Sequence, residues 1–208
     1  MSQRIGSPFI AMLVFAVIPT RGVLAQQPVD PVDFTPFSDG RTWIVKQPLI
    51  YRVGVSKDSV VVPLGFVTDL ASIPPVLQSI IQQNGPYLLP AVVHDYLYWQ
   101  QACTRAQSDR ILLLAMIEHQ VGNAHRVAIY DAVRAAGRFA WADNAREHAR
   151  HQIRIIPANQ LHIPALTNWP QYRSQLMQSG IVDAPALPIP AAFCARGSMP
   201  ISKALTRP

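Results

Sequence analysis

The order of apolar and polar positions divides the chain into a strand-forming stretch, a helical stretch and a proline-rich end. Residues 42–45, 49–55 and 59–67 are short runs rich in β-branched and aromatic side chains, which is the pattern of β-strands. Because these three short strands follow one another closely, they predict a small antiparallel meander.

Three helices are predicted next. The first begins near Pro90, since proline is favoured in a first turn, and ends near Gln101. The second opens on a capping-box pattern over 104–107 and ends near Val121, and the third covers about 124–151. Only about three residues join the first two helices, so these two are expected to pack antiparallel.

Proline-rich segments lie on both sides of this helical stretch. Pro74 and Pro75 stiffen a predicted loop over 68–75, and a short helix is predicted over 76–82. Residues 157–208 contain eight prolines and are predicted to be mostly irregular, either wrapped around the domain or hanging free. The predicted fold class is therefore α+β, mainly α: a small β meander, a three-helix core and a proline-rich tail.

The first 25 residues have the features of a secretory signal peptide. Arg4 supplies a positive charge, and Phe9 to Ile18 is an apolar run too short to span a bilayer. Val23-Leu24-Ala25 precedes Gln26 with the small or apolar residues that signal peptidase prefers. We therefore expect cleavage before Gln26 and export to the periplasm or the medium; an uncleaved anchor is the alternative.

The remaining chain is expected to contain one domain. Residues 26–40 are predicted to form an extended leader, 41–156 a single α/β domain and 157–208 a tail. Half of the residues are apolar and 14% are charged, which excludes a disordered chain. Removal of residues 1–25 takes away two arginines and lowers the net charge from +6 to +4. This charge is scattered rather than gathered in a run, so no nucleic acid is expected as a partner.

Two cysteines, Cys103 and Cys194, are present. In an exported protein they are expected to form a disulfide that ties the tail to the middle of the domain. Two free buried thiols are the alternative.

The candidate chemistry lies in the first helix, at His94-Asp95-Tyr96-Leu97-Tyr98. Ionisable side chains in an otherwise apolar helix are costly to bury unless they are paired or bind a metal. His94 and Tyr98 share a helix face at i and i+4, whereas Asp95 is rotated about 100° away from His94. Asp109, about one turn into the second helix, is within reach across an interaxial gap of ~8–10 Å.

This arrangement predicts a catalytic dyad. Asp109 accepts a hydrogen bond from one ring nitrogen of His94, and the other ring nitrogen is left to act as a base. Tyr98 is expected to hold Asp109 in place. The alternative is that Asp109 merely favours the positive end of the second helix.

Asp69 and Asp95 suggest a metal site beside the dyad. Two carboxylates together with loop carbonyls provide the oxygen ligands that Ca²⁺ accepts. A cation next to a His–Asp dyad is typical of a hydrolase that activates water.

His94-Asp95-x-x-Tyr98 resembles the active-site helix of the secreted phospholipases A2, which carries H-D-x-x-Y. Thr68 to Ser72 is similar to the T-D-G-C-S loop of the bacterial and fungal branch, with Leu70 in place of Gly and Ala71 in place of Cys. The resemblance implies a Ca²⁺-dependent hydrolase of phospholipid esters that acts at a membrane surface. It implies these roles: His94 as base, Asp109 as its orienting partner, Tyr98 as support, and Asp69, Asp95 and the Leu70 carbonyl as calcium ligands.

The chain also resembles, more closely, an uncharacterised domain family of bacteria and their phages. Gly65 to Pro74 matches G-F-x-T-D-x-A-S-I-P, and His94 to Tyr98 matches H-D-x-L-Y. This family brings no established function. Two alternatives to the phospholipid hydrolase therefore stay open: a metal-dependent phosphoesterase, and a non-enzymatic envelope or phage-derived binding protein in which the His/Asp cluster is structural.

Overall fold

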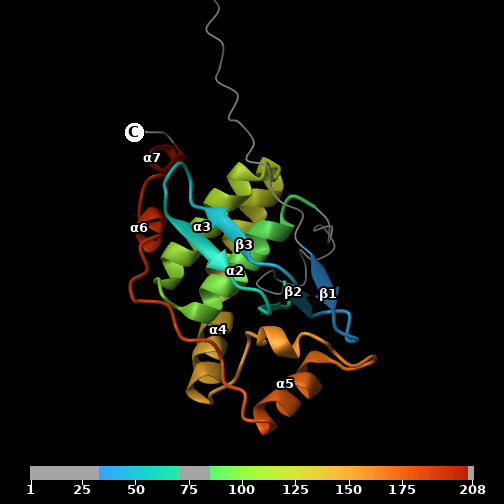
Figure 1. Cartoon of the computed structure of the whole chain (residues 1–208). Coiled ribbons are helices and arrows are strands. Elements are labelled where there is room, and N and C mark those ends of the chain that lie inside the picture. The colour runs from blue at the N-terminus through green and yellow to red at the C-terminus, as the bar shows by residue number, and fades with distance from the viewer. Residues whose placement is uncertain (1–32, 71–84, 206–208) are drawn as a thin grey trace, which may run out of the picture.

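The computed structural model describes residues 33–70 and 85–205 of the chain (Figure 1). The fold is α+β and mainly helical, as predicted. The predicted signal peptide, the predicted helix over 76–82 and Ser72 lie outside the described residues. Within them, no helix is both long enough and apolar enough to cross a membrane.

The five strands found in the described residues form two antiparallel sheets rather than one meander. β2 (Trp43–Val45) lies between β1 (Phe34–Pro36) and β5 (Val67–Thr68), whereas β3 (Leu49–Arg52) pairs only with β4 (Ser59–Val62) in a hairpin. In β3, buried residues alternate with exposed ones, so the hairpin turns one face to the core and the other to solvent. β1 falls within the predicted leader, so the folded domain begins earlier than the sequence indicated.

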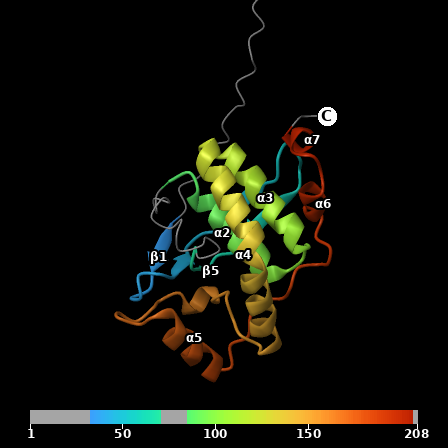
Figure 2. The same cartoon turned by 180° about the vertical axis from the view of Figure 1, so that it is seen from behind.

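The three predicted helices are present. They are α2 (Leu88–Gln100), α3 (Arg105–Glu118) and α4 (Asn123–Ala149). Thr104 and Gln107 form the predicted capping box at the start of α3. The β3–β4 hairpin lies against α2 and α3 in Figure 1, and α4 lies across their opposite side in Figure 2. The helix pair is therefore the middle layer of the domain.

This position explains why α2 is apolar nearly all round. Every residue from Pro90 to Gln100 is buried, because α2 contacts α3, α4 and strands of both sheets. His94 and Asp95 are thus enclosed by protein on the central helix of the fold.

The proline-rich end wraps around the domain and contains helices of its own. These are a short 3-10 helix (Ala158–Gln160), α5 (Trp169–Gln178), α6 (Cys194–Gly197) and α7 (Ile201–Leu205). A mostly irregular tail was predicted, and α5 is the main difference. Asn168 caps α5 reciprocally with Gln171, and a proline stands in its first turn, so standard start signals explain it.

Several contacts fasten this end to the rest of the fold. The predicted disulfide between Cys103 and Cys194 is present. Asp183 accepts hydrogen bonds from the Trp99 indole at 2.8 Å and from the backbone N–H groups of Arg154 and Ile155 at 3.0 and 2.8 Å. One carboxylate therefore joins α2 to two chain segments that follow α4.

Candidate functional site

The structure brings His94, Asp109 and Tyr98 together as predicted. His94 Nε2 lies 3.2 Å from Asp109 Oδ1, and the Tyr98 hydroxyl donates to the same oxygen at 2.5 Å. His94 and Asp109 have no exposed surface. Because α2 and α3 pack side by side, the predicted contact across the helix pair is confirmed; its catalytic role stays a prediction.

Asp109 has a third partner that the sequence analysis missed. Arg105 Nη1 donates to Asp109 Oδ2 at 2.9 Å across one helical turn. The i, i+4 spacing of Arg105 and Asp109 was visible in the sequence and could have indicated this pair. The guanidinium and the tyrosine hydroxyl each donate a hydrogen bond to the carboxyl group, which is fully buried.

Tyr98 is held in place from several sides. Burial, followed by the hydrogen bond to Asp109, raises the pKa of Tyr98 far above its usual range, so the hydroxyl remains a donor. Its ring meets Trp141 edge to face, with ring centroids 5.1 Å apart. Gly137 of α4 faces the hydroxyl, and no larger residue fits there without displacing it. Tyr98 therefore has one position available, which fixes Asp109.

The other ring nitrogen of His94 has no hydrogen-bond partner within residues 33–70 and 85–205. Nδ1 is buried and makes no hydrogen bond. Since the Asp109 carboxylate only accepts, Nε2 must carry the hydrogen that lies between them, and in the neutral ring Nδ1 then keeps a lone pair. This assignment follows from the hydrogen-bond network. In this orientation the lone pair of Nδ1 faces no donor among the residues that the structure describes.

Asp95 points to a different side of α2. Its Oδ2 accepts from the Thr68 hydroxyl at 2.5 Å and from the Leu70 N–H at 3.1 Å. Leu70 has a φ of +53°, in the left-handed region that favours glycine. The backbone here therefore has a conformation that favours glycine, although leucine occupies the position.

Asp69 does not converge with Asp95 on a cation. Asp69 Oδ1 lies 3.3 Å from Arg154 Nη2. Among the residues that the structure describes, no group of three or more His, Cys, Asp or Glu side chains is arranged to hold a metal ion. Asp69 thus has the Arg154 guanidinium beside it, and Asp95 already accepts from Thr68 and Leu70. These contacts do not fit a calcium site formed by Asp69, Leu70 and Asp95 in this arrangement.

A cavity of about 290 Å³ adjoins this second cluster. Its charged lining consists of four carboxylates and two guanidiniums: Asp69, Asp95, Asp143, Glu147, Arg154 and Arg173. His94 does not line it, so the dyad and the cavity face different sides of α2. Arg154 contacts Asp69 on one side and α4 on the other, where it donates to Asn144 Oδ1 at 3.1 Å. Its role could not be found from sequence, since it depends on tertiary contacts.

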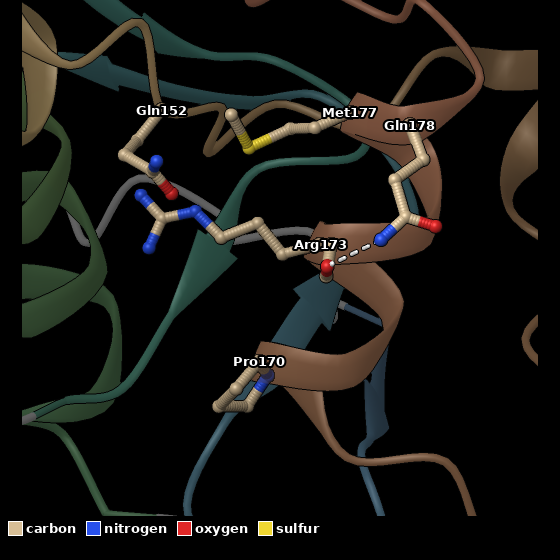
Figure 3. A pocket seen from close by; sticks show the side chains of 6 residues that line it. Gln152, Pro170, Arg173, Met177 and Gln178 are labelled. Atoms are coloured by element: carbon tan, nitrogen blue, oxygen red, sulfur yellow. Dashed lines mark hydrogen bonds between the residues drawn. The ribbon is translucent and has the colours of Figure 1, made fainter.

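A larger cavity of about 500 Å³ lies along α5 (Figure 3). In the figure the Arg173 side chain extends toward Gln152, and Gln178 donates to Ser174 from the next turn. Arg173 lines both cavities and is bound to Glu147 through a contact of 2.6 Å. No residue predicted to be catalytic or metal-binding lines this larger cavity.

In comparisons with known proteins, the stretch that carries the motifs is similar to an uncharacterised family. No curated protein and no solved structure matches the chain. Nothing in these comparisons supports a relationship to the phospholipases A2. Residues 43–133 match the family described as "Protein of unknown function (DUF1353)", so the stretch from β2 into α4, with both motifs and Asp109, is similar to a domain whose function is not established.

Proposed function

We propose that the chain is an exported hydrolase of phospholipid esters in which His94 activates water. One observation carries the proposal: His94 Nδ1 is buried and has no partner in the described part of the chain, while Nε2 is fixed by a carboxylate that has two further donors. Buried nitrogens are rarely left unpaired in folded proteins, and a catalytic role is one recognised reason. A structural histidine gains the hydrogen bond to Asp109 from this orientation, but it gains nothing from a buried Nδ1 that is left unpaired.

The reaction follows from the orientation of the ring. Nδ1 takes a proton from water, and the water oxygen forms a bond to the ester carbonyl carbon. Asp109 stabilises the imidazolium that results. The carbon–oxygen bond to the alcohol then breaks, and the leaving oxygen receives the proton from Nδ1. The products are a fatty acid and a lysophospholipid.

Phospholipid is the substrate class that the H-D-x-x-Y resemblance favours. Arg154 and Arg173 line the cavity beside Asp95 and guanidiniums bind phosphate well, but this cavity faces a different side of α2 from the dyad and does not carry the choice. A phosphate bound there would compete with Asp69 for Arg154 and with Glu147 for Arg173. We assign no step to calcium, since its predicted ligands do not fit in this arrangement. Calcium dependence stays a prediction that requires Asp69 to leave Arg154.

A non-enzymatic role is the second candidate, and complete burial of the dyad favours it. His94 and Asp109 are both 0% exposed, so a substrate reaches Nδ1 only if a neighbouring element moves. In this case the cluster clips α2 to α3, and the protein acts as an envelope binding protein.

The test uses exported protein and three substrates: phospholipid vesicles, a soluble carboxylic ester and a phosphodiester. We expect the wild-type protein to release fatty acid from the vesicles. Activity should fall by orders of magnitude in His94→Ala and in Asp109→Asn, and the double variant should lose little more, because the two residues act as a unit. Asp131→Asn, which changes an exposed carboxylate on α4, is the control.

Unfolding measurements on each variant separate lost chemistry from lost structure. If no substrate is hydrolysed, or if Asp109→Asn is folded and fully active, the hydrolase proposal is wrong. Hydrolysis of the phosphodiester alone would favour the phosphoesterase alternative. Repeating the vesicle assay with a chelator tests calcium, and N-terminal sequencing of the exported protein tests cleavage before Gln26.

A further inference from the structure

Arg173 of α5 separates the two cavities described above. It lines both the cavity of about 290 Å³ beside Asp95 and the cavity of about 500 Å³ along α5 (Figure 3). The lining of the smaller cavity comes from α2, α4, α5 and the segment that follows α4. His94 lines neither cavity, so a ligand bound at Arg173 would occupy a site separate from the proposed hydrolase dyad.

The Arg173 guanidinium has a hydrogen-bond donor that the described part of the fold leaves unused. Its Nη2 donates to Glu147 Oε2 at 2.6 Å, whereas its buried Nε makes no hydrogen bond within residues 33–70 and 85–205. Unpaired buried donors of this kind are rare in folded proteins and require an explanation. Nε and Nη2 share one edge of the planar guanidinium, and two oxygens of a carboxylate or phosphate can accept from both together. Because Glu147 occupies only half of this edge, an oxyanion that takes its place would gain one hydrogen bond more.

The charge of the lining determines what else the ligand must carry. Four carboxylates and two guanidiniums line the smaller cavity, which leaves an excess of two negative charges. Arg146, outside the cavity, pairs with Asp143 and offsets one of them. A simple anion at Arg173 would therefore lie beside an excess of negative charge, which repels it. A ligand that also carries an ammonium group adds no net charge and gives the displaced Glu147 a new partner.

The exposure of the lining side chains indicates how such a ligand would be oriented. The side chains of Arg154 and Arg173 are 13% and 14% exposed. Their partners, Asp69 and Glu147, are 38% and 36% exposed, so the guanidiniums lie deeper than the carboxylates. Asp143 and Glu147 are one helical turn apart on α4, so both can accept from one ammonium group. The oxyanion would therefore lie on the inner side of the cavity and the ammonium group at its rim.

We infer that the smaller cavity binds a small zwitterion, whose oxyanion accepts side-on from Arg173 and whose ammonium group donates to Glu147 and Asp143. A volume of about 290 Å³ is at the lower end for small-molecule sites, so the two charged groups are only a few bonds apart. Free amino acids and the phosphoethanolamine headgroup of lipids share this chemistry. Binding is non-covalent, and the inference does not rest on the proposed function.

Isothermal titration calorimetry of the purified protein tests the ligand class with four probes. Glycine and glycerophosphoethanolamine carry both charges and represent the two sources, whereas inorganic phosphate and ethanolamine each carry one. We expect at least one zwitterion to bind about 10-fold more tightly, or better, than either single-charge probe, because it keeps charged hydrogen bonds at both ends. Binding of glycine alone would identify a free amino acid as the source, and binding of glycerophosphoethanolamine alone would identify the lipid headgroup.

Two variants test the guanidinium edge. Arg173→Lys keeps the positive charge but lacks the edge, so binding of the zwitterion should weaken about 10-fold or more. Glu147→Gln removes the carboxylate that competes for the edge, so inorganic phosphate should bind about 10-fold more tightly than it does to the wild-type protein. An ion pair that serves stability alone predicts no such gain. Arg138→Gln, at an exposed position of α4 that lines neither cavity, is the control and should leave the binding of every probe unchanged.

Three results would overturn the assignment of this site. The first is that inorganic phosphate binds the wild-type protein as tightly as both zwitterions do. The second is that no probe binds at about 10 mM, and the third is that folded Arg173→Lys binds as the wild-type protein does. If Arg173→Lys does not fold, Glu147→Gln decides, and unchanged phosphate binding in that variant overturns the assignment. None of these measurements depends on hydrolysis, so each outcome leaves the hydrolase proposal to its own test.

Discussion

Gly137 leaves space for the hydroxyl that supports the dyad, and replacing it with alanine should be destabilising. At most helix-interior positions Gly→Ala stabilises a protein by ~1 kcal/mol. In α4 an added Cβ would overlap the Tyr98 hydroxyl oxygen and lie 3.3 Å from Cζ of that ring. Tyr98 cannot turn away easily, because it is 1% exposed and packs edge to face on Trp141.

The magnitude follows from three contributions. Overpacking of a core costs ~1–3 kcal/mol, and loss of a buried hydrogen bond to a charged group costs ~1.5–3 kcal/mol. The gain in helix propensity offsets ~1 kcal/mol of this. The two costs do not add fully, because a movement of Tyr98 that relieves the overpacking also breaks its hydrogen bond. We therefore expect Gly137→Ala to lower the free energy of unfolding by about 2–3 kcal/mol.

A double-mutant cycle identifies the cause. In a Tyr98→Phe background the overlapping oxygen is gone, so Gly137→Ala should stabilise the protein by about 0–1 kcal/mol, which gives a coupling energy of about 2–4 kcal/mol. Ala135→Gly, at an exposed position of the same helix, measures the propensity difference alone.

Equilibrium denaturation in urea provides all of these values. If Gly137→Ala stabilises the protein by ~1 kcal/mol, as at an unconstrained helix position, the argument that α4 fixes Tyr98 is refuted.

Three further outcomes are expected. Replacing Cys103 and Cys194 together with serine should lower the free energy of unfolding by about 4 kcal/mol in the chain-entropy model, since the disulfide closes a loop with a sequence separation of 91, as urea denaturation would show. Asp183→Ala leaves an indole and two backbone donors without their acceptor and should cost about 2–4 kcal/mol; a loss below 1 kcal/mol would contradict its role as a tie. Burial raises the pKa of Glu118, although the Tyr51 hydroxyl opposes this, so the folded state holds a proton at a pH where the unfolded chain has lost it, and stability should fall as pH rises above the ordinary value of 4.5. Glu118→Gln should flatten that fall, and an unchanged slope would show that another group causes it.

The dyad was predictable because helical geometry fixes it. The i and i+4 positions of His94 and Tyr98 set one face, and the short connection with its capping box set the direction of the next helix. With the helix face and the direction of α3 set in this way, few side chains other than His94 and Tyr98 lay within reach of Asp109.

The second cluster was not predictable in the same way. Asp69 meets Arg154, which is 85 positions later in the chain, and no local period connects them. The sheets differ from the predicted meander for a similar reason. β2 pairs with β1 and with β5, which follows it only after the β3–β4 hairpin, and β3 and β4 pair with each other. In the C-terminal part, the many prolines concealed α5, although one of them stands in its first turn.

The way the C-terminal part completes the core sets the size of the smallest fragment that can fold. The stretch similar to the uncharacterised family stops at Val133, in the middle of α4. Beyond it, Ile155 bridges to Phe66, and Trp169 and Leu176 share one apolar cluster with Val67. A fragment cut at the family boundary would expose these core surfaces to water and should aggregate. A relative limited to the matched stretch must therefore cover the same surfaces with a different C-terminal segment or with another chain.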